Sequence, residues 1–170
     1  MLLTLDLATK TGWTFGAPED RQFASGVYHI AETVKDDIGK FAQDFDRWLL
    51  ARLGGVTYCV FESPVFPGAS GNLVTLRKLY GLVWHTEWQC RQKGISCFEV
   101  NNASIKMFMG VKRRGAEGKQ DMIRAVERYD YEPVDDNEAD AIALRLYTIH
   151  LRYPKLADAF QLRLGALGAA

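Results

Sequence analysis

The chain has little of the chemistry that marks a secreted, membrane-bound or cysteine-based protein. Its 170 residues include three cysteines, which lack the paired spacing of a metal site, and three scattered histidines. No signal-peptide pattern begins the chain, and no apolar run is long enough to cross a bilayer. An odd number of cysteines without such a signal predicts reduced thiols. We therefore expect a cytoplasmic protein with no membrane partner.

Neither sign of charge is in excess. The 21 Lys and Arg residues balance the 21 Asp and Glu residues, so the formal net charge is zero and any basic surface must be local. The hydrophobic fraction of 48% is ordinary for a globular protein, and we find no internal repeat. These features predict one domain at residues 1–153, followed by a helical or frayed tail at 154–170.

Hydrophobic periodicity predicts three early strands followed by alternating helices and strands. The expected strands are 2–7, 11–15, 23–30, 57–61 and 95–100. The expected helices are 34–53, 72–93, 103–109, 119–129 and 135–152, with a loop at 110–118 and a further short helix after Pro154. Strands joined by short turns should be antiparallel, whereas strands reached through a helix should be parallel. The pattern indicates an α/β fold with a mixed central β-sheet flanked by helices.

Acidic residues stand at three places where apolar patterns predict burial. Asp6 and Glu62 lie at the ends of apolar strands, and Asp140 lies on the apolar side of helix 135–152. Clustered carboxylates cannot all stay ionised without a cation or a raised pKa. Oxygen ligands without a His or Cys cluster predict Mg²⁺ or Mn²⁺, and two such ions can catalyse phosphodiester hydrolysis. The alternative, an acid that caps the helix, is favoured for Asp135.

Three motifs, taken in order, resemble the RuvC-type Holliday-junction resolvases. They are Leu-Thr-Leu-Asp6-Leu-Ala-Thr-Lys-Thr-Gly12-Trp, Val-Phe-Glu62-Ser-Pro and Asn137-Glu-Ala-Asp140-Ala. The resemblance covers residues 1–152 and includes segments 101–106 and 115–120. It implies a ribonuclease H-like fold and a two-metal endonuclease that nicks branched DNA such as four-way junctions. It also implies a homodimer, because two symmetric nicks need two sites.

The resemblance also implies roles for individual residues. Asp6, Glu62 and Asp140 match three acidic metal ligands, and Lys119 matches a lysine near the scissile phosphate. The family's remaining ligand, a carboxylate or His, falls at Asn137, three residues before the last acid. Asn supplies an oxygen but no charge. That position favours Asn137 as the fourth ligand, with Asp136 as the alternative because it lies one helical turn before Asp140.

Basic and aromatic residues in three segments are candidates for DNA contact. The densest positive segment is the glycine-flanked loop at 110–118, where phosphate neutralisation is expected. Each basic residue could instead be a solvated charge, and an aromatic residue after Glu62 could either wedge between bases or pack in its loop. The candidates are Phe66, Arg77, Lys78, Lys106, Lys112, Arg113, Arg114 and Lys119.

Two other functions remain open from the sequence. An actin-like or sugar-kinase-like ATPase shares the topology and also begins with a strand, an Asp and a Gly/Thr turn. The chain is short for two such lobes and lacks a second Gly-rich phosphate loop. A catalytically weakened junction-binding protein is the other alternative, which Asn137 supports. Metal-dependent nicking of a four-way junction distinguishes the nuclease from both, and nucleotide binding would favour the ATPase.

Overall fold

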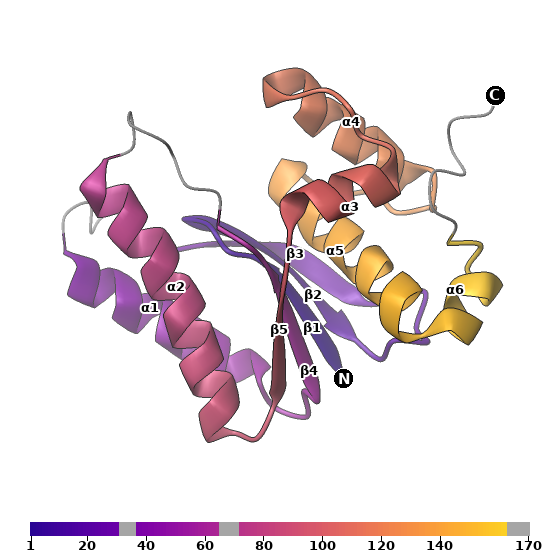
Figure 1. Cartoon of the computed structure of the whole chain (residues 1–170). Coiled ribbons are helices and arrows are strands. Elements are labelled where there is room, and N and C mark those ends of the chain that lie inside the picture. The colour runs from indigo at the N-terminus through magenta and orange to yellow at the C-terminus, as the bar shows by residue number, and fades with distance from the viewer. Residues whose placement is uncertain (31–36, 65–71, 163–170) are drawn as a thin grey trace.

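The computed structural model describes residues 1–30, 37–64 and 72–162 (Figure 1). Its strands are β1 (Leu2–Asp6), β2 (Lys10–Gly16), β3 (Ala24–His29), β4 (Tyr58–Glu62) and β5 (Ser96–Val100). Its helices are α1 (Ile38–Arg52), α2 (Leu73–Gln92), α3 (Asn102–Met109), α4 (Gly115–Glu127), α5 (Asp136–Arg152) and α6 (Pro154–Ala159). The elements alternate as the sequence predicts.

The strands form one mixed sheet in the order β3-β2-β1-β4-β5. The first three strands pair antiparallel through short connections, whereas β4 and β5, each reached through a helix, run parallel to β1. Parallel neighbours need such a crossover, and antiparallel neighbours do not. The predicted α/β class with a mixed central sheet is confirmed.

Helices cover both faces of the sheet. Figure 1 shows α1 and α2 on one face and α5, with α3, α4 and α6 around it, on the other. Successive residues of a strand face opposite sides. Leu3 and Leu5 therefore pack with the α1–α2 cluster, while Leu2 packs with the α5 cluster. Asp6, on the same side of β1 as Leu2, faces α5.

One predicted helix start differs by several residues within the described part of the chain. Helix α4 begins at Gly115 rather than at residue 119, so the loop predicted at 110–118 is shorter than expected. Its first turn packs tightly: a Cβ on Gly118 would lie 2.5 Å from the Arg113 carbonyl oxygen. The turn contains no apolar residue larger than alanine, so hydrophobic periodicity gives no sign of it.

At the start of α1, the predicted residues 34–36 lie outside the described part of the chain. Asp37 is the N-cap, and its side chain accepts a hydrogen bond of 3.0 Å from the Lys40 backbone N–H. After α5, the short helix expected beyond Pro154 is present as α6. Ala157 and Leu162 are buried in the same core as α5.

None of the helices in residues 37–64 and 72–162 is long and apolar enough to cross a membrane.

Candidate active site

Asp6 and Glu62 lie at the same edge of the sheet. Strands β1 and β4 are parallel, and their register pairs Leu5 with Phe61. The two acids occupy the next position on each strand, so the carboxyl ends of the strands bring them together. Side-chain alternation turns both toward α5, because Leu5 and Phe61 belong to the opposite core cluster.

Helix α5 comes unusually close to this edge. Gly12 pairs with Asp6 across β1 and β2, and it lies directly beneath the first turn of α5. A Cβ at Gly12 would lie 2.5 Å from the carbonyl carbon of Asn137 and would overlap its oxygen. Only glycine leaves room for this contact, so Gly12 sets the height of α5 above the sheet.

Two buried threonines hold the next turn of α5 in place. The Thr4 hydroxyl donates to the Ala141 carbonyl oxygen at 2.9 Å, and it lies 2.6 Å from the Thr14 hydroxyl oxygen. Both threonines are fully buried, where an unpaired hydroxyl would be costly. This network anchors the turn that carries Asp140.

Residues before Asp140 have two distinct roles at the start of α5. Asp135 is the N-cap, as the sequence predicts, and accepts from the backbone N–H groups of Asn137 (2.9 Å) and Glu138 (3.0 Å). The Asn137 side-chain amide also donates to Asp135, at 3.1 Å. Asp136 instead forms an ion pair with Lys119 of α4. The two candidates for a fourth ligand therefore have different partners.

Helix α3 supplies two polar groups to Glu62. The Asn102 amide donates to Glu62 Oε1, and Lys106, one turn further along, is electrostatically coupled to Glu62 and Asp140. The sequence analysis named Lys106 as a DNA contact and missed Asn102. A signal was present, because Asn102 lies two residues after the end of β5, whose carboxyl end adjoins that of β4.

Burial and mutual repulsion disfavour negative charge on Asp6. Desolvation is the main cause that raises its pKa well above the ordinary value, and Glu62, Asp140 and Asp136 raise it further. Lys119 opposes the shift. Glu62, Asp140 and Asp136 are thus the acids whose negative charges act on Asp6.

Burial also raises the pKa values of Asp140 and Glu62. Burial, and then the charge of Glu62, raise the pKa of Asp140 to about 7. Burial also raises the pKa of Glu62, although Asn102 and Lys106 counter it. At neutral pH the cluster therefore takes up protons or a cation. An oxygen-rich set of this kind fits a hard divalent ion such as Mg²⁺ or Mn²⁺.

The carboxylates are not drawn into a tight group. In the described residues, one set of three or more His, Cys, Asp or Glu ligand atoms lies within 4.8 Å of one another, and it consists of Cys59, Cys90 and Cys97. The acidic oxygens are thus spread more widely than those sulfurs. Mutual repulsion between like charges favours such a spacing.

The predicted basic segment is only partly available for DNA. Arg113 Nε donates to Asp121 Oδ2 at 2.6 Å, and its Nη1 lies 3.6 Å from Glu117 Oε2. Hydrogen bonds from Arg113 and Arg124 lower the pKa of Asp121. The Arg113 side chain is therefore paired with acidic residues of α4, although it is exposed like its neighbours Lys112 and Arg114.

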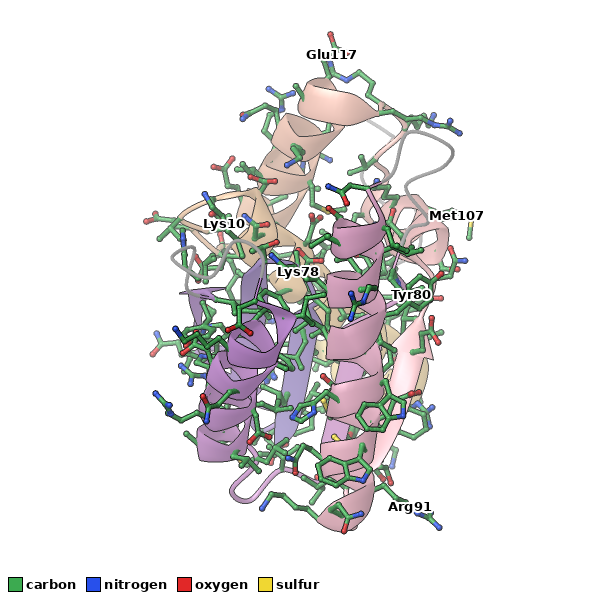
Figure 2. The ribbon with its side chains drawn as sticks, turned by 90° about the vertical axis from the view of Figure 1, so that its left-hand side faces the viewer. Lys10, Lys78, Tyr80, Arg91, Met107 and Glu117 are labelled. Atoms are coloured by element: carbon green, nitrogen blue, oxygen red, sulfur yellow. The ribbon has the colours of Figure 1, made fainter. Side chains whose placement is uncertain are left out.

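The other predicted DNA contacts lie on α2 or beyond the described residues. Lys78 lies between α1 and α2, with its Nζ 5.1 Å from the centre of the Phe41 ring (Figure 2). Arg77 and Lys78 border a pocket of about 190 Å³ between these two helices. Phe66 is in the segment 65–71, which lies outside the described residues.

Comparison with known proteins was made by sequence and by structure. No protein-family model and no curated protein sequence matches the chain. Among solved structures, Thermus thermophilus RuvC in complex with a Holliday junction substrate has a TM-score of 0.66 at 13% identity, covering 96% of this chain and 95% of that one. Another Thermus thermophilus RuvC structure has a TM-score of 0.59 at 14% identity, covering 96% of each chain.

A more distant match is the yeast mitochondrial Holliday junction resolvase Ydc2. Its TM-score is 0.54 at 9% identity, and the alignment covers 94% of this chain and 83% of that chain. At these identities the likeness concerns the fold. It extends over nearly the whole length of both chains, and so it confirms the predicted fold: the chain has the ribonuclease H-like fold of the RuvC-type resolvases.

Proposed function

We propose that the protein is a metal-dependent endonuclease that nicks the backbone of branched DNA and resolves Holliday junctions. The observation that carries this proposal is the convergence of Asp6, Glu62 and Asp140 at one edge of the sheet, where burial raises the pKa of all three. The fold shared with RuvC, one of whose structures contains a Holliday junction substrate, supports the choice of substrate.

Asp6, Glu62 and Asp140 would hold Mg²⁺ or Mn²⁺, and we propose two ions, as the family resemblance implies. When bound, such ions supply Lewis acidity and neutralise charge that develops on the phosphate. The protein's part is to keep the carboxylates ionised, aligned and close to the sheet. Asn102 and Lys106 do so for Glu62, since both favour its ionised form.

For the fourth ligand we favour Asp136 over Asn137. The Asp136 carboxylate is electrostatically coupled to Asp6 and Asp140. The Asn137 amide is already bonded to the N-cap Asp135, and it carries no charge. A carboxylate also attracts a divalent ion more strongly than an amide oxygen does.

Lys119, the ion-pair partner of Asp136, also has a catalytic role in this proposal. It lies beside Asp136 and is coupled to Asp140 and Asp6, and all three stabilise its charged form. A permanent positive charge at this position can stabilise negative charge on the phosphate in the transition state. We propose Lys112, Arg114, Arg77, Lys78 and Phe66 as further DNA contacts, and Lys112, Arg114 and Arg77 are exposed.

A homodimer would allow two symmetric nicks. Helix α2 offers an apolar surface for a second copy: Tyr80, Trp84 and Trp88 recur every four residues and are 48%, 63% and 44% exposed. Trp84 and Trp88 stack with their ring centres 6.1 Å apart. Figure 2 shows Tyr80 on the side of α2 away from α1.

We propose that the surface formed by Tyr80, Trp84 and Trp88 packs against the same surface of a second copy of the chain. Trp84→Glu should then shift the sedimenting species to monomer, and an unchanged species would contradict it.

The function is tested by cleavage of a synthetic four-way junction with and without Mg²⁺. We expect paired nicks that require the metal, and an Asp6→Asn variant that binds the junction but does not cut it. Binding without nicking by the unaltered protein would favour a weakened junction-binding protein. ATP binding without nicking would favour the ATPase.

We further propose a reducing, cytosol-like compartment, because all three cysteines are free thiols.

A further inference from the structure

Three cysteines that are distant in sequence meet on the face of the sheet opposite the acidic cluster. Cys59 in β4 and Cys97 in β5 are direct partners in the parallel register. Cys90, in the last turn of α2, lies over them. The three sulfur atoms all lie within 4.8 Å of one another. Cys59 and Cys90 are fully buried, and Cys97 is partly exposed.

We propose that Cys59, Cys90 and Cys97 form a binding site for one thiophilic divalent ion of the zinc class, which ties α2 to β4 and β5. Thiolate sulfur selects soft or borderline ions, whereas the carboxylates of the candidate active site select hard ones. The two sites lie on opposite faces of the sheet and differ in ligand chemistry.

The geometry requires little adjustment. Zn–S bonds of about 2.3 Å in a tetrahedral arrangement place neighbouring sulfurs about 3.8 Å apart. Sulfurs within 4.8 Å of one another reach this spacing through small side-chain movements. Three protein ligands leave a fourth position for water. That position opens beside Cys97, the member of the group that solvent reaches.

The meeting of three thiols distinguishes this site from a disulfide, which needs only two and would leave the third unused. All three sulfurs lie close enough together to share one ion, which would bind them as thiolates with release of their protons.

Charge and surroundings agree with a divalent ion. Three neutral thiols bind M²⁺ through three new M–S bonds and release three protons, so that the bound group carries one negative charge. A monovalent ion would leave two negative charges in the core, which is more costly. Glu87, which is exposed and coupled to Cys97, adds negative potential at the open side and favours a cation there.

The test is titration of the reduced, full-length protein with Co²⁺ and then Zn²⁺. We expect one Co²⁺ per chain to produce thiolate-to-cobalt charge-transfer absorption, which Zn²⁺ then abolishes. Zn²⁺ should release three protons per chain and protect all three thiols from alkylation. The same bands should appear in an Asp6→Asn/Asp140→Asn variant, which separates this site from the carboxylates and from the fate of the proposed nuclease function.

Cys97→Ser is the informative variant, because the side chain is partly exposed and the change is nearly isosteric. It should weaken Zn²⁺ binding at least tenfold and remove most of the charge-transfer band. Ser96→Ala, an exposed neighbour on β5, is the matched control and should change neither. Absence of charge-transfer absorption at excess Co²⁺ in the unaltered protein would overturn the proposal. So would alkylation of the thiols at an unchanged rate when Zn²⁺ is present.

Discussion

Gly12 of β2 lies directly beneath the backbone carbonyl of Asn137, so tightly that a single added carbon would overlap the oxygen. The contact joins the strand that pairs with Asp6 to the helix that carries Asp140. The distance between two of the proposed metal ligands therefore depends on a position with no side chain. Active-site geometry of this kind is sensitive to shifts of a fraction of an ångström.

Gly12→Ala should push the first turn of α5 away from the sheet. We expect overpacking to cost about 1–3 kcal/mol of stability. Displacement of Asp140 should also lower the nicking rate by roughly 100-fold. Gly81→Ala in α2 is the matched control, because nothing lies within 4 Å of the added carbon. It should leave activity unchanged and stabilise the helix by about 0.5–1 kcal/mol. Equal effects of the two variants would refute the role given to Gly12.

Stability should depend on pH through Asp140 when no divalent ion is added. Its pKa is raised from 3.8 to about 7 in the folded protein, so between these values the folded state binds more protons than the unfolded state. The stabilising effect of protonation is complete below 3.8 and is lost as pH rises to about 7. The full loss is on the order of a few kcal/mol.

Thermal unfolding with a chelator present should therefore show a falling midpoint across this pH range. Added Mg²⁺ should flatten the decline, because a bound cation favours the ionised carboxylate. Asp140→Asn should reduce the decline without Mg²⁺, whereas Asp158→Asn on α6 should leave it unchanged. A midpoint that rises from pH 4 to pH 7 in the chelated protein would show that the sign is wrong.

The choice between Asp136 and Asn137 can be made by alanine substitution. If Asp136 is the fourth ligand, Asp136→Ala should raise the Mg²⁺ concentration needed for nicking at least tenfold, and Asn137→Ala should change it little. Asp135→Ala should cost about 1 kcal/mol of stability through loss of the N-cap, with a smaller effect on Mg²⁺ dependence. Because Asp136→Ala also removes the partner of Lys119, Lys119→Ala is measured beside it. If Asn137→Ala raises the Mg²⁺ requirement more than Asp136→Ala does, Asn137 is the fourth ligand, as the family pattern favours.

The exposed basic residues before α4 should contribute to junction affinity through phosphate contacts. Lys112→Ala and Arg114→Ala should each lower the slope of log affinity against log salt by about one. Arg113→Ala should instead cause a small loss of thermal stability with little change in slope, since Arg113 is bound to Asp121. Arg91→Ala, at the opposite end of the molecule from Glu117 of α4, is the control (Figure 2). An unchanged slope for Lys112→Ala and Arg114→Ala would exclude them from the interface.

Patterns between near neighbours in the chain predicted most of the fold. Alternation of apolar residues, helical periodicity and short turns were sufficient for the mixed sheet and its parallel and antiparallel pairs. They also indicated that Asp6 and Glu62 end buried strands and that Asp135 caps α5. These features are local, because side-chain periodicity and capping depend on residues a few positions apart.

Contacts between distant segments were decided by the tertiary structure. The sequence does not show that Gly12 meets Asn137, that Asn102 bonds to Glu62, or that Arg113 is held by Asp121. Nor does it show that three cysteines without metal-site spacing bring their sulfurs together. Each of these contacts depends on how helices pack against the sheet. The positions of the acids could thus be predicted from local pattern, whereas their partners and spacing are set by packing, which no local pattern encodes.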